Sequence, residues 1–115
     1  MLGLGSAFEV KDLGTLAADG VGTAVQTAGY DLTFQVTVSG IGTNVVVRLE
    51  GSLDGVNYGS LRDSSGSSDF TITANGTTLY GMRGPVQWVR LRRVSASGGT
   101  PSVTGSVGCA FKTYS

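Results

Sequence analysis

The stretch NVVVRLEGSLDGVNYGSL, from Asn44 to Leu61, limits the possible folds of this chain more than any other. Before its Asp54-Gly55 step the side chains alternate, with apolar residues on one face and polar residues such as Arg48 and Glu50 on the other. A period of two is typical of a β-strand that has one face in a core. Asp54-Gly55 favours a type I′ turn, in which both central residues have positive φ. The sequence therefore predicts a strand that folds straight back on itself.

The register of this hairpin has a consequence for packing. A two-residue turn places Gly51 opposite Tyr58, so that the tyrosine ring lies over a residue without a side chain. Asn75-Gly76 is a second type I′ signal, and its register places Phe70 opposite Gly81. The sequence therefore predicts two hairpins that use the same aromatic-over-glycine contact.

Period-two segments recur along the whole chain, and no segment shows helical spacing over more than one turn. The expected strands, besides the central stretch, are 14–18, 21–28, 31–39, 69–74, 77–83, 86–94 and 102–112. Short half-polar strands at this spacing predict an all-β fold, a single antiparallel β-sandwich or jelly roll of about eight strands. We expect residues 1–12 to form an N-terminal arm or edge strand, and residues 13–115 to form the sandwich domain.

Charge is scarce and balanced, with eight Lys and Arg against eight Asp and Glu, together 14% of the chain. This balance gives no reason to expect nucleic acid or an anionic membrane as partner. A surface built from Ser, Thr, Gly, Asn and Gln instead tolerates contact with other proteins. The single cysteine, Cys109, excludes an internal disulfide framework and is expected to face inward as a small hydrophobe.

The N-terminal residues MLGLGSAF lack the basic start and continuous apolar run of a signal peptide. No stretch approaches the roughly 18 apolar residues of a membrane span. We therefore expect either a cytosolic product or one that leaves the cell without a cleaved signal.

The absence of histidine removes the usual general base and the commonest metal ligand. A paired-carboxylate glycosidase would need a deep cleft, for which a sandwich of 115 residues leaves little room. We therefore expect no enzymatic activity, no catalytic residue, no cofactor and no metal. The run from Asp54 to Asn57 lacks the later ligands of an EF-hand, so a hairpin turn is favoured there. A calcium site across loops, with Asp63 or Asp69 contributing, is left open.

Three motifs carry a family resemblance: VRLEGSLDGVNY, then WVRLRRV, then a glycine-rich turn into an alternating final strand. Together they resemble small β-sandwich structural proteins of tailed bacteriophages, over roughly Gly14 to Phe111. Two features depart from that pattern. Tyr58 stands where the pattern usually has Trp, and the doubled Arg92-Arg93 would turn Arg93 inward. We expect a β-bulge at this point, which would bring Val94 back into register with the apolar residues before it.

The resemblance implies a virion structural protein, and within that class a capsid decoration (cement) protein that binds and stabilises the outer shell. Its implied partners are the major capsid protein and further copies of the chain, with a homotrimer favoured. The implied location is the capsid surface, after synthesis in the host cytoplasm. The alternative is a carbohydrate- or receptor-binding sandwich module of a phage tail appendage. Its sugar-stacking platforms would be Trp88, Tyr30, Tyr58, Tyr80 and Tyr114.

Trp88, Arg90 and Arg92 share the outward face of one expected strand, and Trp and Arg dominate interface hot spots. We therefore predict a contact surface here. The alternative is that Trp88 caps the edge of the sandwich with Arg90 stacked on it. Glu50 would then form a simple cross-strand pair with an arginine, stabilising the fold by about 1 kcal/mol or less if exposed.

The second part of the predicted interface is an apolar arm at the N-terminus. It consists of Met1, Leu2, Leu4 and Phe8. These side chains would be a liability on a soluble monomer, so we expect them to lie on a shell or on a neighbouring subunit. The alternative is that the arm adds an edge strand to its own sheet.

Overall fold

The structure is a computed structural model that describes residues 5–27, 31–83 and 86–113, with side chains described for 9–27, 32–83 and 86–109. All regular elements in this part of the chain are strands. They are β1 (Gly5–Leu16), β2 (Gly20–Val21), β3 (Val25–Gln26), β4 (Asp31–Ser52), β5 (Gly59–Ser60), β6 (Phe70–Ile72), β7 (Gly76–Met82) and β8 (Trp88–Thr113). Among the described residues, no helix is long and apolar enough to cross a membrane.

Two long strands, β4 and β8, form the centre of the molecule. They pair antiparallel from Asp31 opposite Ala110 to Ser52 opposite Trp88. Midway, both strands bend and turn back, at 40–43 in β4 and 97–100 in β8, where the register shifts. A Cβ on Gly42 would lie 2.3 Å from the carbonyl carbon of Gly98, so the two backbones approach closer than any side chain allows. The bend therefore depends on glycine.

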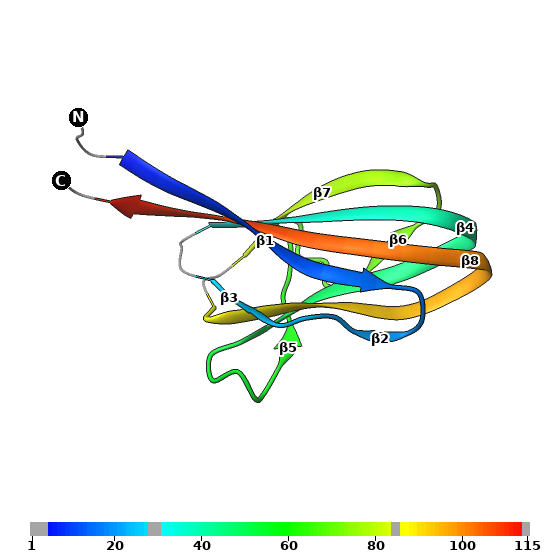
Figure 1. Cartoon of the computed structure of the whole chain (residues 1–115), viewed down its shortest axis with the longest axis horizontal. Helices are drawn as coiled ribbons and strands as arrows, with labels where there is room; N and C mark the ends of the chain where they lie inside the picture. The colour runs from blue at the N-terminus through cyan, green and yellow to red at the C-terminus, as the bar shows by residue number, and fades with distance from the viewer. Residues whose placement is uncertain (1–4, 28–30, 84–85, 114–115) are drawn as a thin grey trace.

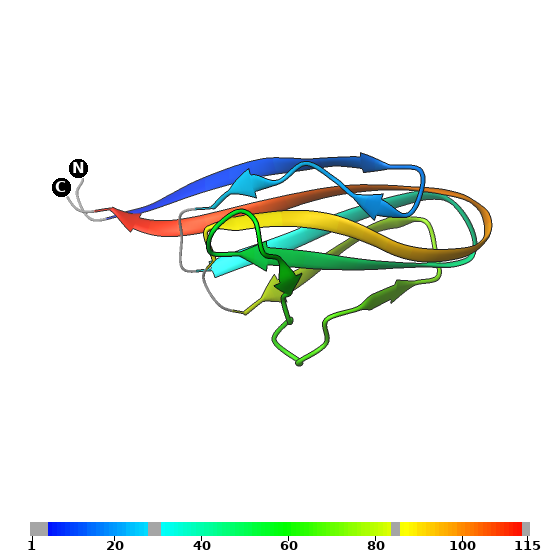
Figure 2. The ribbon, with the colours of Figure 1, turned by 90° about the horizontal axis from the view of Figure 1, so that it is seen from below.

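The remaining strands flank this central pair and complete one antiparallel sheet (Figures 1 and 2). β1 pairs with the second half of β8, while β2 and β3 pair with its first half. β7 pairs with the first half of β4, and β5 and β6 pair with its second half. The sheet curls into a half-barrel. An all-β antiparallel fold is thus confirmed, while the more specific sandwich or jelly-roll arrangement stays a prediction.

β1 runs across residue 12, where the sequence suggests the end of an arm. It pairs with β8 from Gly5 opposite Thr113 to Leu16 opposite Val103. A bulge between Asp12 and Gly14 leaves Leu13 out of the ladder and turns it fully into the core. Beyond residue 110, β8 no longer pairs with β4, and the start of β1 and the end of β8 extend from the body as a two-stranded ribbon (Figure 1).

One apolar core lies inside the curl, and both halves of the sheet contribute to it. The buried hydrophobic residues are Leu13, Leu32, Phe34, Val36, Val38, Val45, Val47, Leu49, Phe70, Ile72, Met82, Val89, Leu91, Val103, Val107 and Cys109. The alternation read from the sequence predicts most of this set, because side chains on a strand point to opposite faces in turn. The inward position predicted for Cys109 is confirmed.

The first predicted hairpin is wrong in its turn and in its register. Gly51 pairs with Gly59, one residue beyond the expected Tyr58, and the connection is the loop 53–58. Of the two turn residues, Gly55 has a positive φ and Asp54 does not, and the Asp54 carboxylate accepts hydrogen bonds from the amides of Val56 and Asn57. A Cβ on Gly51 would meet the side chain of Leu61 at 3.0 Å, so Leu61 and not the tyrosine covers this glycine.

The second predicted hairpin is also wrong, because β6 and β7 do not pair with each other. β6 pairs with residues 45–47 and β7 with residues 32–38, on different halves of β4. The Asn75 side chain accepts a hydrogen bond from the amide of Ile41 in the bend, at 2.9 Å. The curl brings both halves of β4 within reach, so these strands cross from one half to the other.

The bulge expected near Arg92-Arg93 is present, but one residue later than needed to turn Arg93 outward. Val46 pairs with Ser95 and Val47 with Arg93, which leaves Val94 as the extra residue. Arg93 consequently stays on the inward face and is buried. The expected return of Val94 to the core face does not occur: Val94 is only partly buried.

Candidate functional site

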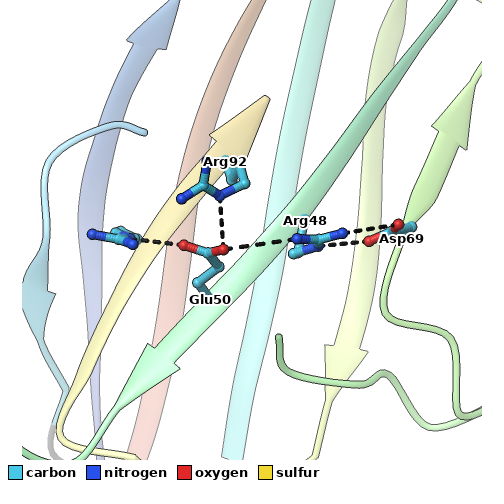
Figure 3. Close-up of polar contacts among 5 residues, drawn as sticks. Arg48, Glu50, Asp69 and Arg92 are labelled. Atoms are coloured by element: carbon cyan, nitrogen blue, oxygen red, sulfur yellow. Dashed lines mark hydrogen bonds and ion pairs between the residues drawn. The ribbon is translucent and has the colours of Figure 1, made fainter. Parts of the chain in front are cut away.

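A charged cluster covers the outer side of the sheet where the second half of β4 meets the first half of β8 (Figure 3). We call it the arginine face, and it consists of Arg48, Glu50, Asp69, Arg90 and Arg92. The antiparallel register places Glu50 directly opposite Arg90, and Arg48 opposite Arg92. Because alternate residues on neighbouring strands share a side of the sheet, these four side chains are held together by the backbone.

Glu50 lies at the centre of the arginine face and is only 6% exposed. Its Oε1 accepts a hydrogen bond from Nε of Arg90 at 2.8 Å, and its Oε2 accepts one from Nε of Arg92 at 2.7 Å. Burial alone would raise the pKa of Glu50, but the hydrogen bonds from Arg92 and Arg90 outweigh it and hold that pKa below its ordinary value. The predicted cross-strand pair is thus a three-residue contact around a buried carboxylate.

Arg48 is engaged by a second carboxylate. Its Nε and Nη2 donate to the two oxygens of Asp69 at 2.6 and 3.1 Å, a bidentate contact (Figure 3). The same hydrogen bond raises the pKa of Arg48 and lowers the pKa of Asp69. Nη1 of Arg48 also lies 3.9 Å from Oε2 of Glu50. The arginine face therefore joins three guanidinium groups and two carboxylates, with a formal charge of +1.

Two aromatic residues border the arginine face, in a different arrangement from the predicted one. The guanidinium of Arg90 lies 3.9 Å from the centre of the Tyr58 ring, a cation–π contact. Trp88 lies beside the loop after β4, where a Cβ on Gly55 would come within 3.0 Å of the indole nitrogen. Tyr58, rather than Trp88, therefore stacks on Arg90.

The predicted interface residues are only partly described. Trp88, Arg90 and Arg92 come from β8 and share its outer side, as their spacing requires; their role in contacts stays a prediction. Met1, Leu2 and Leu4 lie outside the described residues. Phe8 is described by its backbone alone, in β1 opposite Ala110.

Asp69 and Tyr58 contact the arginine face, although the sequence predicted neither of them there. Tyr58 lies in the loop 53–58, where no alternation indicates which way a side chain points. Asp69 lies at the start of the expected strand 69–74, but the sequence does not show which strand pairs beside it. One signal in the sequence could have indicated the contact of Asp69. Arg48 had no carboxylate assigned to it, and Asp69 begins an expected strand whose partner strand was open.

Two of the tyrosines proposed as sugar platforms stack on other side chains of the chain. Tyr58 stacks on Arg90, and Tyr80 stacks on Phe70 with ring centres 4.0 Å apart. Tyr30 and Tyr114 lie outside the described residues.

The loop carboxylates are also used locally. Asp54 accepts hydrogen bonds from the amides of Asn57 and Val56, which lower its pKa, and Asp63 accepts from Ser65 and Ser67 with the same effect. Within residues 5–27, 31–83 and 86–113, no group of three or more His, Cys, Asp or Glu side chains is placed to hold a metal ion.

Comparison with known proteins identifies the fold and leaves the family open. No family model matches the chain, and no curated protein matches it. Among solved structures, the chain is similar to YomS, a protein derived from the SPBc2 prophage, with a TM-score of 0.56 and 13% sequence identity. The match covers 90% of this chain and 94% of YomS, so nearly the whole of both chains shares one fold.

Proposed function

We propose that this chain is a structural protein of a tailed bacteriophage and that it acts as a capsid decoration protein. The observation that carries the proposal is the likeness, over nearly the whole of both chains, to the prophage-derived YomS. The sequence motifs that resemble phage structural proteins support it independently. A tail appendage is the other location compatible with this likeness.

The mechanism is adhesion to the shell by a polar surface with little charge. On the outer side of the first half of the sheet, Thr15, Thr104, Thr37 and Thr77 follow one another across four strands. Their hydroxyls pair at 2.8 Å, Thr15 with Thr104 and Thr37 with Thr77. Charged residues are depleted from the centres of protein interfaces, so this uncharged row favours contact with protein. Several copies bound as a closed ring, such as a trimer, would bridge neighbouring capsid subunits against the pressure of packaged DNA.

The proposal is tested by cryo-EM of intact virions produced from the genome that encodes the chain, with copies counted in the same sample. Hundreds of copies on the icosahedral shell are expected. A few copies at the tail or at one vertex would contradict the decoration role and favour the appendage. Absence from the virion would overturn the proposal as a whole.

A further inference from the structure

We propose that the arginine face binds a carboxylate side chain of a protein partner. Arg90 and Arg92 would both donate hydrogen bonds to this carboxylate. For the identity of that partner, the capsid shell, the inference rests on the proposed function; for the chemistry of the site it rests on the contacts below.

The first step is that Arg90 and Arg92 are both held in place, yet each keeps hydrogen-bond donors that are available to a ligand. Each donates its Nε hydrogen to Glu50, at 2.8 and 2.7 Å. An arginine carries four further N–H groups on its two Nη atoms. For Arg90 and Arg92 these make no hydrogen bond to the described residues, whereas Arg48 commits both Nε and Nη2 to Asp69.

The second step is the charge balance. Asp69 neutralises Arg48, and Glu50 neutralises one of its two arginines, which leaves one positive charge shared by Arg90 and Arg92. One incoming carboxylate would make the arginine face neutral. Planar guanidinium groups match the two oxygens of a carboxylate, and such charge-assisted hydrogen bonds are among the strongest in proteins.

The third step is that these groups are accessible and preorganised. The side chains of Arg90 and Arg92 are 24% and 34% exposed. Buried Glu50 holds one end of each, and the Tyr58 ring supports Arg90. Side chains that are already ordered lose less entropy when a ligand binds, so the site gains affinity without new contacts.

The surroundings favour a protein over a nucleic acid. Val21, which is 40% exposed, lies opposite Arg92 on the same side of the sheet, and Tyr58 and Trp88 lie at the other end. Arginine among aromatic and aliphatic groups is typical of protein interface hot spots. Nucleic acid would need a longer basic track, whereas this chain has no net charge and half-exposed Asp69 borders the site.

The chemistry is tested on the whole chain by NMR, following the Nε–Hε signals of its arginines. The probe is a tetraglutamate peptide with blocked ends, compared with tetraglutamine. We expect the Arg90 and Arg92 signals to shift saturably with tetraglutamate. Binding of tetraglutamine, measured from the same signals, should be at least tenfold weaker. Equal shifts at Arg83, which follows β7 and donates to the Ser64 carbonyl, would overturn the site. Tighter binding of inorganic phosphate would overturn the assignment to a carboxylate.

The partner is tested with capsids that lack the chain. Arg90→Gln and Arg92→Gln are each expected to raise Kd by about tenfold or more, and the control Arg83→Gln, which removes the same charge, by less than about twofold. Urea unfolding of each variant checks that it folds. Arg92→Lys keeps the positive charge but removes the planar guanidinium group. Capsid binding as tight as that of the wild type would therefore contradict a site in which both guanidinium groups bind the carboxylate.

The outcomes separate the two proposals. If the wild-type chain binds capsids and the Arg90 and Arg92 variants bind equally well, the inference fails and the decoration role stands. If the wild-type chain does not bind capsids, the decoration role fails, and the peptide titration still decides whether the arginine face binds carboxylates.

Discussion

Arg93 places a guanidinium group on the core side of β8. Its side chain is 8% exposed, and its Nη1 lies 3.3 Å from a carboxylate oxygen of Asp19, which is itself 59% exposed. Its Nε is buried and has no hydrogen-bond partner among the described residues. A buried charge offsets the loss of its hydration only when it is well paired and fully hydrogen-bonded. Arg93 meets neither condition, in contrast to Glu50 on the other side of the same strands.

Replacing Arg93 by methionine is therefore expected to leave the free energy of unfolding unchanged or to raise it by about 1 kcal/mol, because methionine fills a similar space without a charge. Asp19→Asn should instead lower it by about 1 kcal/mol, since the buried guanidinium loses its charged partner. Urea unfolding at pH 7 measures both. A loss of more than about 2 kcal/mol in Arg93→Met would show that the ion pair stabilises the fold.

Among the strands, β4 and β8 decide the architecture because they stay paired through the bend. Gly40, Gly98 and Gly99 adopt positive φ there, and Gly42 lies against the backbone of the opposite strand. Short flanking strands such as β5 and β6 contribute few ladder pairs of their own. Their positions follow from the course of the two long strands.

Gly42→Ala is expected to lower the free energy of unfolding by about 3 kcal/mol, or to prevent folding. The new Cβ would fall 2.3 Å from the Gly98 carbonyl carbon and 2.4 Å from the Gly99 nitrogen, which are backbone atoms that cannot rotate away. The matched control is Gly59→Ala in β5, where nothing lies within 4 Å. This control should stay within about 0.5 kcal/mol of the wild type. Equal stability of both variants in thermal unfolding would contradict the role given to the bend.

The pairing of the strands also predicts a pattern of amide hydrogen exchange. The first half of β4 is paired on both sides, by β7 and β8, whereas β2, β3 and β5 are two residues long. Amides in the ladders of residues 32–38 should exchange only on global unfolding, and those of the short strands at least about 100-fold faster. Native-state exchange followed by NMR measures this difference. Uniform protection across all strands would contradict it.

The molecule as a whole should respond to acid through its carboxylates. The pKa values of Glu50, Asp54, Asp63 and Asp69 are all lowered in the folded state, by hydrogen bonds from arginines or from loop donors. In the unfolded chain these groups have ordinary values near 4, so they bind protons there first as the pH falls. Their contribution to stability is complete above that range and is lost as the pH falls through the folded-state values.

The free energy of unfolding should accordingly stay nearly constant from about pH 5 to 8, where the chain has no histidine to titrate, and should fall below about pH 4. Urea unfolding at a series of pH values measures the profile. Asp54→Asn removes one of the lowered carboxyls, so its profile should be flatter in acid. A stability that rises below pH 4 would contradict the assignment.

The local pattern of the sequence was sufficient to predict the strand segments of β4 and β8 and most of the core, whereas the observed β1, β2 and β3 differ from the expected strands 14–18 and 21–28. In 31–39 and 44–52, alternation depends only on the period of an extended backbone, so the buried side chains of β4 could be predicted without knowing its partners. The same period predicted that Arg48 and Glu50 share one side of the sheet, and likewise Arg90 and Arg92.

Tertiary structure alone decided how these strands were combined. The turn signal at Asn75-Gly76 is local, but the curl of the sheet lets β6 and β7 pair with different halves of β4, so the predicted hairpin does not form. At Asp54-Gly55 the chain does turn back, but through the longer loop 53–58 and in another register. The contacts of the arginine face likewise join segments that lie far apart in the sequence. Buried Glu50 accepts hydrogen bonds from Arg90 and Arg92, and Tyr58 stacks on Arg90. Hydrophobic periodicity is a property of one strand, whereas pairing and charge burial depend on which strands the folded chain brings together.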